Sequence, residues 1–191
     1  TEPVSVVIPG QVAAMVPVKF ADSAGRQRVR SFTAEAAAGG GTQSYTWSNL
    51  KPGTYLYHSG THPQVQVQMG LYGAMTLNLP KLTATGPNRA YAGVPYTREV
   101  TLLFSEIDPL LHAAVANGRY GAPVPGSLPP GLTAADYPSS TIDYAPKYFL
   151  INGKPYTTRA GATLPIARTG VNTLVRFLNA GPTADSDCGG S

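Results

Sequence analysis

Few side chains in this sequence can bind a metal or carry a reaction. There are three histidines, His58, His62 and His112, and a single cysteine, Cys188. Imidazole nitrogens suit copper, so His58 and His62, close together in the sequence, are the candidates for holding one ion with help from another chain. The alternative is structural, because a histidine at the end of a buried strand can simply hydrogen-bond a backbone group in the core. His112 falls in an expected helix and is predicted to be a surface or cap residue.

Short strands are the elements expected to position these histidines. The 21 glycines and 18 prolines exceed ordinary usage, which indicates many strands joined by turns. Alternation of apolar and polar residues predicts strands at residues 5–8, 29–33, 44–47, 54–57, 64–69, 75–79, 100–104, 148–151 and 173–178. The Asn152-Gly153 pair, which lies between two apolar runs, predicts a β-hairpin.

One short helix is expected among the strands, near residues 109–117. Asp108 is its predicted N-cap, Pro109 occupies its first position and Gly118 is its predicted stop. Residues 119–147, which follow it, are Pro-rich and irregular. We expect them to form a long loop without secondary structure of its own.

The sequence is predicted to divide into two β units. Residues 81–97 are rich in Gly, Pro and Thr and lack periodicity, so the expected units are 1–88 and 97–191, joined by a linker at 89–96. The second unit stops where further strands would be needed to close a sandwich. Unclosed sheets leave unpaired strand edges, so an additional protein segment or subunit is expected to cover them.

Composition argues against several classes of function. Charged residues make up 13% of the sequence and the net charge is +4, with basic residues scattered apart from Arg26, Arg28 and Arg30. These three arginines are predicted to form the solvated face of one strand. Nucleic-acid binding is not expected, because no aromatic residues interleave with clustered basic ones. No run approaches the roughly 20 apolar residues of a membrane span, and residues 1–3 do not resemble a signal peptide.

Three motifs follow one another in a defined order. Residues 53–64 read Gly-Thr-Tyr-Leu-Tyr-His-Ser-Gly-Thr-His-Pro-Gln, and a Gly-Leu-Tyr-Gly turn occupies residues 70–73. Residues 149–154 contain Ile-Asn-Gly, and residues 176–181 end in Asn-Ala-Gly. Together they resemble multicopper oxidases such as laccases. The resemblance implies an all-β fold of tandem cupredoxin-like Greek-key β-sandwich units, the second one partial. It further implies copper-dependent oxidoreductase chemistry and a secreted, periplasmic or cell-surface location.

Departures from that family fall at the copper ligands. The family's first ligand motif has the form Pro-Thr-Ser-x-His-Trp-His-Gly, and its counterpart here has Val7 and Pro9 where imidazoles should stand. In the second motif the family has His-Ser-His, whereas Gly60-Thr61 is inserted here between His58-Ser59 and His62. This insertion either loops out and leaves His62 in the place of the second ligand, or removes the site.

Cys188 does not restore the missing chemistry. A type 1 copper centre needs a Cys thiolate with two His ligands and a weak axial partner, and no histidine lies near Cys188 in the sequence. An internal disulfide is excluded, because there is only one cysteine. An odd cysteine in a secreted protein indicates pairing with another segment.

Three functions are therefore open. The first is a fragment of a multicopper oxidase with at most a residual copper site at His58 and His62, not catalytically competent alone. The second is a degenerate cupredoxin scaffold that acts as a structural, assembly or surface protein. The third is a simple copper-binding or copper-storage protein. The resemblance favours the first function, and the altered ligand motifs favour the second.

Overall fold

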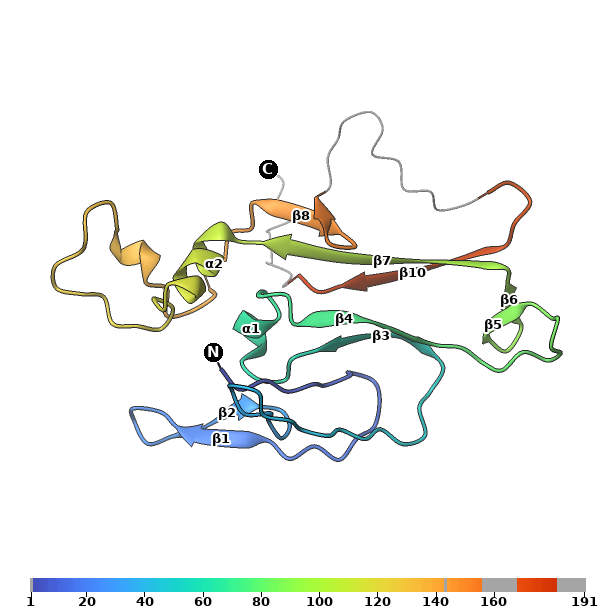
Figure 1. Cartoon of the computed structure of the whole chain (residues 1–191), viewed down its shortest axis with the longest axis horizontal. Coiled ribbons are helices and arrows are strands. Elements are labelled where there is room, and N and C mark those ends of the chain that lie inside the picture. The colour runs from blue at the N-terminus through green and yellow to red at the C-terminus, as the bar shows by residue number, and fades with distance from the viewer. Residues whose placement is uncertain (1, 143, 156–167, 182–191) are drawn as a thin grey trace, which may run out of the picture.

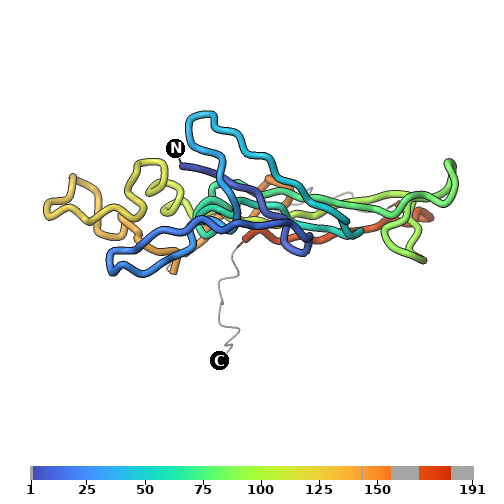
Figure 2. Tube along the Cα trace, turned by 90° about the horizontal axis from the view of Figure 1, so that it is seen from below, coloured from blue at the N-terminus to red at the C-terminus, as the bar shows by residue number. Residues whose placement is uncertain are grey.

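Short strands dominate the computed structural model, which describes residues 2–142, 144–155 and 168–181. The molecule is flat and elongated, as two perpendicular views show (Figures 1 and 2). The expected all-β class is confirmed. No helix among the described residues has the length and apolarity needed to cross a bilayer. The elements are β1 (Val18–Ala21), β2 (Gln27–Ser31), β3 (Gly53–His58), α1 (Pro63–Gln66), β4 (Tyr72–Leu77), β5 (Asn88–Tyr91), β6 (Val94–Tyr96), β7 (Arg98–Ile107), α2 (Pro109–Ala116), η1 (Ala134–Asp136), β8 (Tyr148–Ile151), β9 (Lys154–Pro155) and β10 (Thr173–Asn179).

The N-terminal half contains two antiparallel pairs, β1–β2 and β3–β4. The strands expected at residues 5–8 and 44–47 are reduced to single bridges, one joining Val7 to His58 and the other joining Ala13 to Trp47. Of the three arginines predicted to form a solvated face, Arg26 and Arg28 lie mostly in solvent, whereas Arg30 leaves 36% of its side chain exposed and pairs with Glu35. Arg26 and Arg28 both pair with Asp22, and they leave 67% and 53% of their side chains exposed.

The strand predicted at residues 64–69 is wrong. These residues form α1 and the turn after it, because Pro63 begins a helix directly after His62, whose φ of 37° breaks the extended chain. The alternating glutamines do not make a wet strand face. Gln66 and Gln68 are 5% and 7% exposed, and both hydrogen-bond inside the protein.

Residues 81–97 also differ from the expectation, since β5 and β6 form an antiparallel hairpin there. Gly93 takes a φ of +76° in its turn, a conformation that glycine adopts without steric cost. Ala90 and Tyr96 are 1% and 4% exposed, so the hairpin buries apolar surface rather than acting as a bare connection.

A four-stranded sheet in the order β10-β7-β8-β9 forms the C-terminal half. β10 runs parallel to β7 from Thr173 to Asn179, whereas β8 is antiparallel to β7. The predicted hairpin between β8 and β9 is confirmed. Asn152 and Gly153 have φ values of 52° and 74°, the positive pair that a type I′ turn requires.

The helix prediction is confirmed residue by residue. The carboxylate of Asp108 accepts hydrogen bonds from the backbone N–H groups of Leu110 and Leu111 at 2.8 and 3.3 Å. Pro109 fills the first position and Gly118 follows the end of α2 with a φ of +65°. The second carboxylate oxygen of Asp108 accepts a hydrogen bond from the N–H of Ala145 at 3.1 Å, and this contact fixes the end of the loop after α2. Within this loop the only departure from irregular structure among the described residues is the short η1.

A buried arginine joins the two halves. Arg176 on β10 leaves 3% of its side chain exposed, and its Nε donates to Glu99 Oε1 on β7 at 3.0 Å. Its two terminal nitrogens donate to Thr54 Oγ1 on β3 and to Asn78 Oδ1, each at 2.6 Å. Burial raises the pKa of Glu99, but hydrogen bonds from Tyr96 and Arg176 outweigh this effect and lower the pKa overall. The β3–β4 hairpin is thereby fixed along β10 and β7 (Figure 1).

The substitution Arg176→Leu should lower the free energy of unfolding by about 2–4 kcal/mol, because Glu99, which is 24% exposed, would be left half-buried without its cation. Because the pKa of Glu99 is lowered in the native state, its contribution to wild-type stability is present above the ordinary value of 4.5 and declines as the pH falls below it. The variant should instead gain stability on acidification from neutral pH, since protonation removes the buried charge. Urea unfolding at several pH values measures both trends. Arg28→Leu, on an exposed arginine, is the control, and equal effects of the two substitutions would contradict the assignment.

Replacing Asp108→Ala should destabilise the protein by about 1–2 kcal/mol, because three backbone N–H groups lose their acceptor. Urea unfolding followed by circular dichroism measures the change. Asn117→Ala, at the exposed opposite end of α2, should cost less. A change below about 0.5 kcal/mol for Asp108→Ala would show that water replaces the cap.

Candidate functional site

His58 ends β3 and is held on both sides by backbone pairing. It is the cross-strand partner of Tyr72 on β4, and it exchanges two backbone hydrogen bonds with Val7, at 2.9 and 3.0 Å. Its ring Nδ1 lies 2.8 Å from the carbonyl oxygen of Ser59 and donates to it. The backbone hydrogen bond expected under the structural alternative is therefore present. His58 Nε2 has no hydrogen-bond partner among the described residues.

His62 lies apart from that strand, at the N-terminus of α1. Its backbone is left-handed, and its carbonyl oxygen accepts from the N–H groups of Val65 and Gln66. The ring Nδ1 contacts Glu2 Oε2 at 3.3 Å, and a third of the side chain is exposed. His62 is therefore the N-cap residue of α1 and does not continue β3.

The inserted Thr61 is the reason for this separation. It does not loop out, because Thr61 is fully buried and pairs with Ser31 on β2. Its hydroxyl lies 3.0 Å from Ser5 Oγ and 3.2 Å from Ser31 Oγ, and these two hydroxyls are 2.9 Å apart. Ser59 Oγ continues the network by donating to Gln66 Oε1 at 2.6 Å. Buried hydroxyls that hydrogen-bond one another therefore surround Thr61, which lies between the two histidines in the sequence.

A cleft opens beside His58 where the two halves meet. Gln68 links the N-terminal half to the C-terminal half at this cleft. Its carbonyl oxygen accepts a hydrogen bond from His112 Nε2 at 2.9 Å, and its Oε1 accepts one from the Tyr144 hydroxyl at 2.5 Å. Burial, together with the nearby carboxylates of Glu106 and Asp108, raises the pKa of Tyr144 well above its ordinary value, so this phenol stays a donor. His112 is therefore half-buried and bridging, not a surface or cap residue. The cleft is lined by Leu56, His58, Pro63, Gln64, Val67, Gln68, Thr141, Tyr144, Asn179, Ala180 and Gly181.

Metal ligands are not assembled at these positions. Within residues 2–142, 144–155 and 168–181, no three His, Cys, Asp or Glu side chains come together in a group that could hold an ion. Cys188 lies outside the described residues. Groups that orient the rings are expected at Ser59 or Gln64, and of these the Ser59 carbonyl oxygen accepts from the His58 ring.

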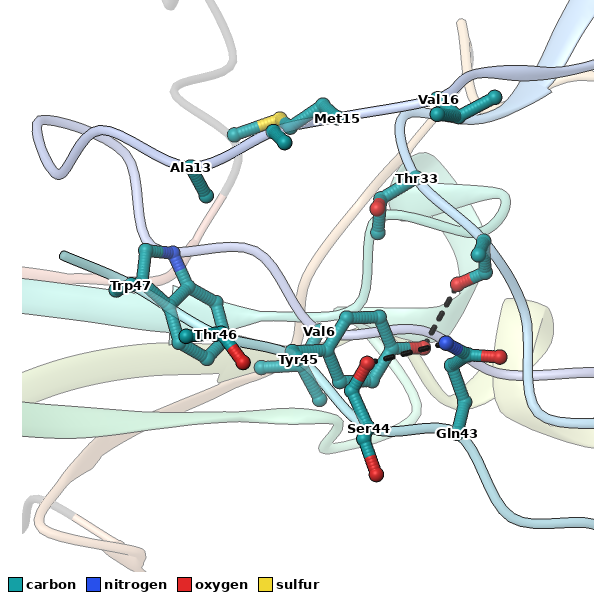
Figure 3. A pocket seen from close by; sticks show the side chains of 12 residues that line it. Val6, Ala13, Met15, Val16, Thr33, Gln43, Ser44, Tyr45, Thr46 and Trp47 are labelled. Atoms are coloured by element: carbon teal, nitrogen blue, oxygen red, sulfur yellow. Dashed lines mark hydrogen bonds between the residues drawn. The ribbon is translucent and has the colours of Figure 1, made fainter.

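A second hollow lies near the N-terminal loops, between residues 13–16 and 43–47 (Figure 3). Its described lining is uncharged. The rings of Tyr45 and Trp47 are 6.1 Å apart, and the Tyr45 hydroxyl donates to the carbonyl of Ala34 at 2.7 Å. Trp47 Nε1 is buried and has no partner among the described residues. The lining carries hydroxyl and amide groups but no carboxylate, imidazole, amine or thiol that could activate them.

Comparison with protein-family models, with curated proteins and with solved structures found no match. The functional argument therefore depends on the geometry of the chain itself.

Sequence reasoning missed the residues that join the halves, namely Arg176, Glu99, Gln68 and Tyr144. Arg176 gave a usable signal, since it is the only charged residue in the apolar run at 174–178. Gln68 gave a misleading one, because its alternation with valines is typical of a strand.

Replacing Thr61→Val keeps the shape but removes the central hydroxyl, and it should cost about 1–3 kcal/mol by leaving buried oxygens poorly satisfied. Urea unfolding measures the loss. Thr42→Val, at an exposed loop position, is the matched control and should change the free energy of unfolding by less than about 0.5 kcal/mol. Equal, small effects at both positions would argue against a structural hydroxyl cluster.

Proposed function

We propose that this protein is a structural module with a cupredoxin-type scaffold in which packing has replaced the metal site. The observation that carries the proposal is the fully buried Thr61 between His58 and His62, inside a hydroxyl network. A site built for copper would turn imidazoles toward this interior. Here the interior is filled by groups that bind one another.

Gly60 and Val7 give further support. Gly60 follows His58 by two residues, the spacing of the two histidines in the family's His-Ser-His motif. A Cβ atom at Gly60 would lie 2.8 Å from Val7 Cγ1 and 3.0 Å from Ser5 Oγ, so no larger side chain fits without a shift. Val7 is also the residue at a ligand place of the first motif. Val7, at a place that the resemblance assigns to an imidazole, is thus closely packed against the inserted Gly60.

A residual copper site at His58 and His62, within a multicopper oxidase completed by another segment, is the second candidate. One observation favours it. Each ring uses Nδ1 in a hydrogen bond, to a backbone carbonyl in His58 and to a carboxylate in His62, which is how metal-ligating histidines are oriented. Nε2 of each ring is left without a partner among the described residues. The proposed setting, outside the cytoplasm, depends on the family resemblance under either candidate.

Copper content separates the two candidates. We expect purified protein, dialysed exhaustively and measured by elemental analysis, to hold close to no copper before and after loading with Cu(I) or Cu(II). The polar groups in the interior of the scaffold already hydrogen-bond one another, so they offer no strong copper site. His112→Ala serves as the matched control, because this ring is engaged through Nε2 with Gln68. About one ion per chain, lost in His58→Ala or His62→Ala but kept in His112→Ala, would overturn the scaffold proposal and establish the copper site.

A further inference from the structure

One face of the C-terminal sheet carries a group of large apolar side chains, here called the aromatic face. Strand register places its members on one side of the sheet, because paired residues of neighbouring strands share a side and alternate residues along a strand return to it. Phe104 pairs with Ile151, Ile151 pairs with Lys154, and Glu106 pairs with Phe149. Phe177 on β10 joins them, since its ring stacks on Phe104 with centroids 6.3 Å apart and an interplanar angle of 3°.

The opposite side of the same sheet is already covered. Arg176 points to that side and is buried against β3, whereas its neighbour Phe177 points the other way and is 65% exposed. Phe149 is 59% exposed. Parallel strand pairs such as β7–β10 occur almost only in sheets with both faces covered. The described residues cover one face of this pair and leave aromatic surface on the other.

The aromatic face also carries a carboxylate without a partner. Three buried side-chain polar atoms have no hydrogen-bond partner within the described part of the chain, and one of them, Glu106 Oε1, belongs to a residue of this face. Glu106 lines one apolar pocket with Phe104 and Phe149. Burial raises the pKa of Glu106, so its charge is poorly compensated. A partner that covers this face is favoured if it brings a cation.

Lys154 gives the aromatic face a positive charge beside the negative charge of Glu106, so the face is complementary in charge to the same face of a second copy. It is exposed at the end of the β8–β9 hairpin, on the same side as Glu106, and no ion pair of Lys154 occurs among the described residues. In a two-fold symmetric interface, a residue pair that meets once meets again with the roles exchanged. Two copies packed through the aromatic rings can thus bring each lysine to the other copy's carboxylate.

We propose that the aromatic face binds a second copy of this chain in a two-fold dimer, with Lys154 of each copy paired to Glu106 of the other. The stacked rings of Phe104 and Phe177, together with Phe149, form the apolar centre of the interface, and the two ion pairs fix its orientation. This inference goes beyond the scaffold role and does not depend on whether copper binds. The copper measurement tests the scaffold proposal and the oligomeric state tests the dimer, so either proposal can be overturned without the other.

Charge exchange tests the pairing. Wild-type protein is examined by sedimentation velocity over a wide concentration range, alongside Glu106→Lys and Lys154→Glu. Each single variant places like charges opposite each other in its own homodimer, and we expect its dimer dissociation constant to rise at least about tenfold. Mixing the two variants restores opposite charges at both contacts. The mixture should therefore form a heterodimer, with a dissociation constant near that of wild type.

Phe177→Ser tests the apolar centre, and Leu82→Ser, at a leucine 80% exposed elsewhere, is its matched control. Only the first should abolish the dimer, while circular dichroism shows both to be folded. Monomeric wild-type protein at every concentration would overturn the proposal. So would single charge variants that dimerise as wild type, or a mixture that does not recover dimerisation, because either result means that Glu106 and Lys154 do not meet.

Discussion

A single buried guanidinium sets the arrangement of this molecule. Arg176 has almost no exposure, so each of its donors needs an acceptor within the protein, and the acceptors come from three separate parts of the chain. Glu99 supplies the compensating charge, and Thr54 and Asn78 complete the set. Satisfying this one side chain fixes how β3 lies against β10 and β7. It also decides which side of the sheet is covered, because alternation along β10 turns Phe177 away from Arg176.

Local sequence signals predicted the elements whose residues have one dominant conformational preference. Asp108 and Pro109 start a helix because a carboxylate cap and a fixed φ act over a few residues. Asn152-Gly153 makes a hairpin turn because both residues tolerate positive φ. The prediction of a strand at residues 64–69 was wrong because it used the alternation of apolar and polar residues and ignored Pro63, which begins a helix. Bridges such as the one between Val7 and His58 could not be foreseen, since they depend on distant segments meeting.

The candidate site shows the same division. Comparison of motifs identified the altered ligand positions, and the structural alternative for His58 was foreseen as well. The burial of Thr61 was not, because a threonine in a Gly-Thr insertion gives no sign in the sequence of whether it faces water or a hydroxyl partner. Ser5 and Ser31, its partners, are distant in sequence. Buried polar clusters of this kind are satisfied only by long-range contacts, which no local pattern encodes.

The parallel pairing of β7 with β10 has a consequence for the order in which the chain folds. Glu99 and Arg176 are 77 residues apart, so their contact closes a long loop whose entropy must be lost before the ion pair forms. During synthesis β3, β4 and β7 all leave the ribosome before β10 exists. For that interval Glu99 has no cation, and the edge of β7 that will receive β10 lies open. The contacts of Arg176 can therefore form only after β10 has been made, and until then the edge of β7 that receives it is open to other pairing.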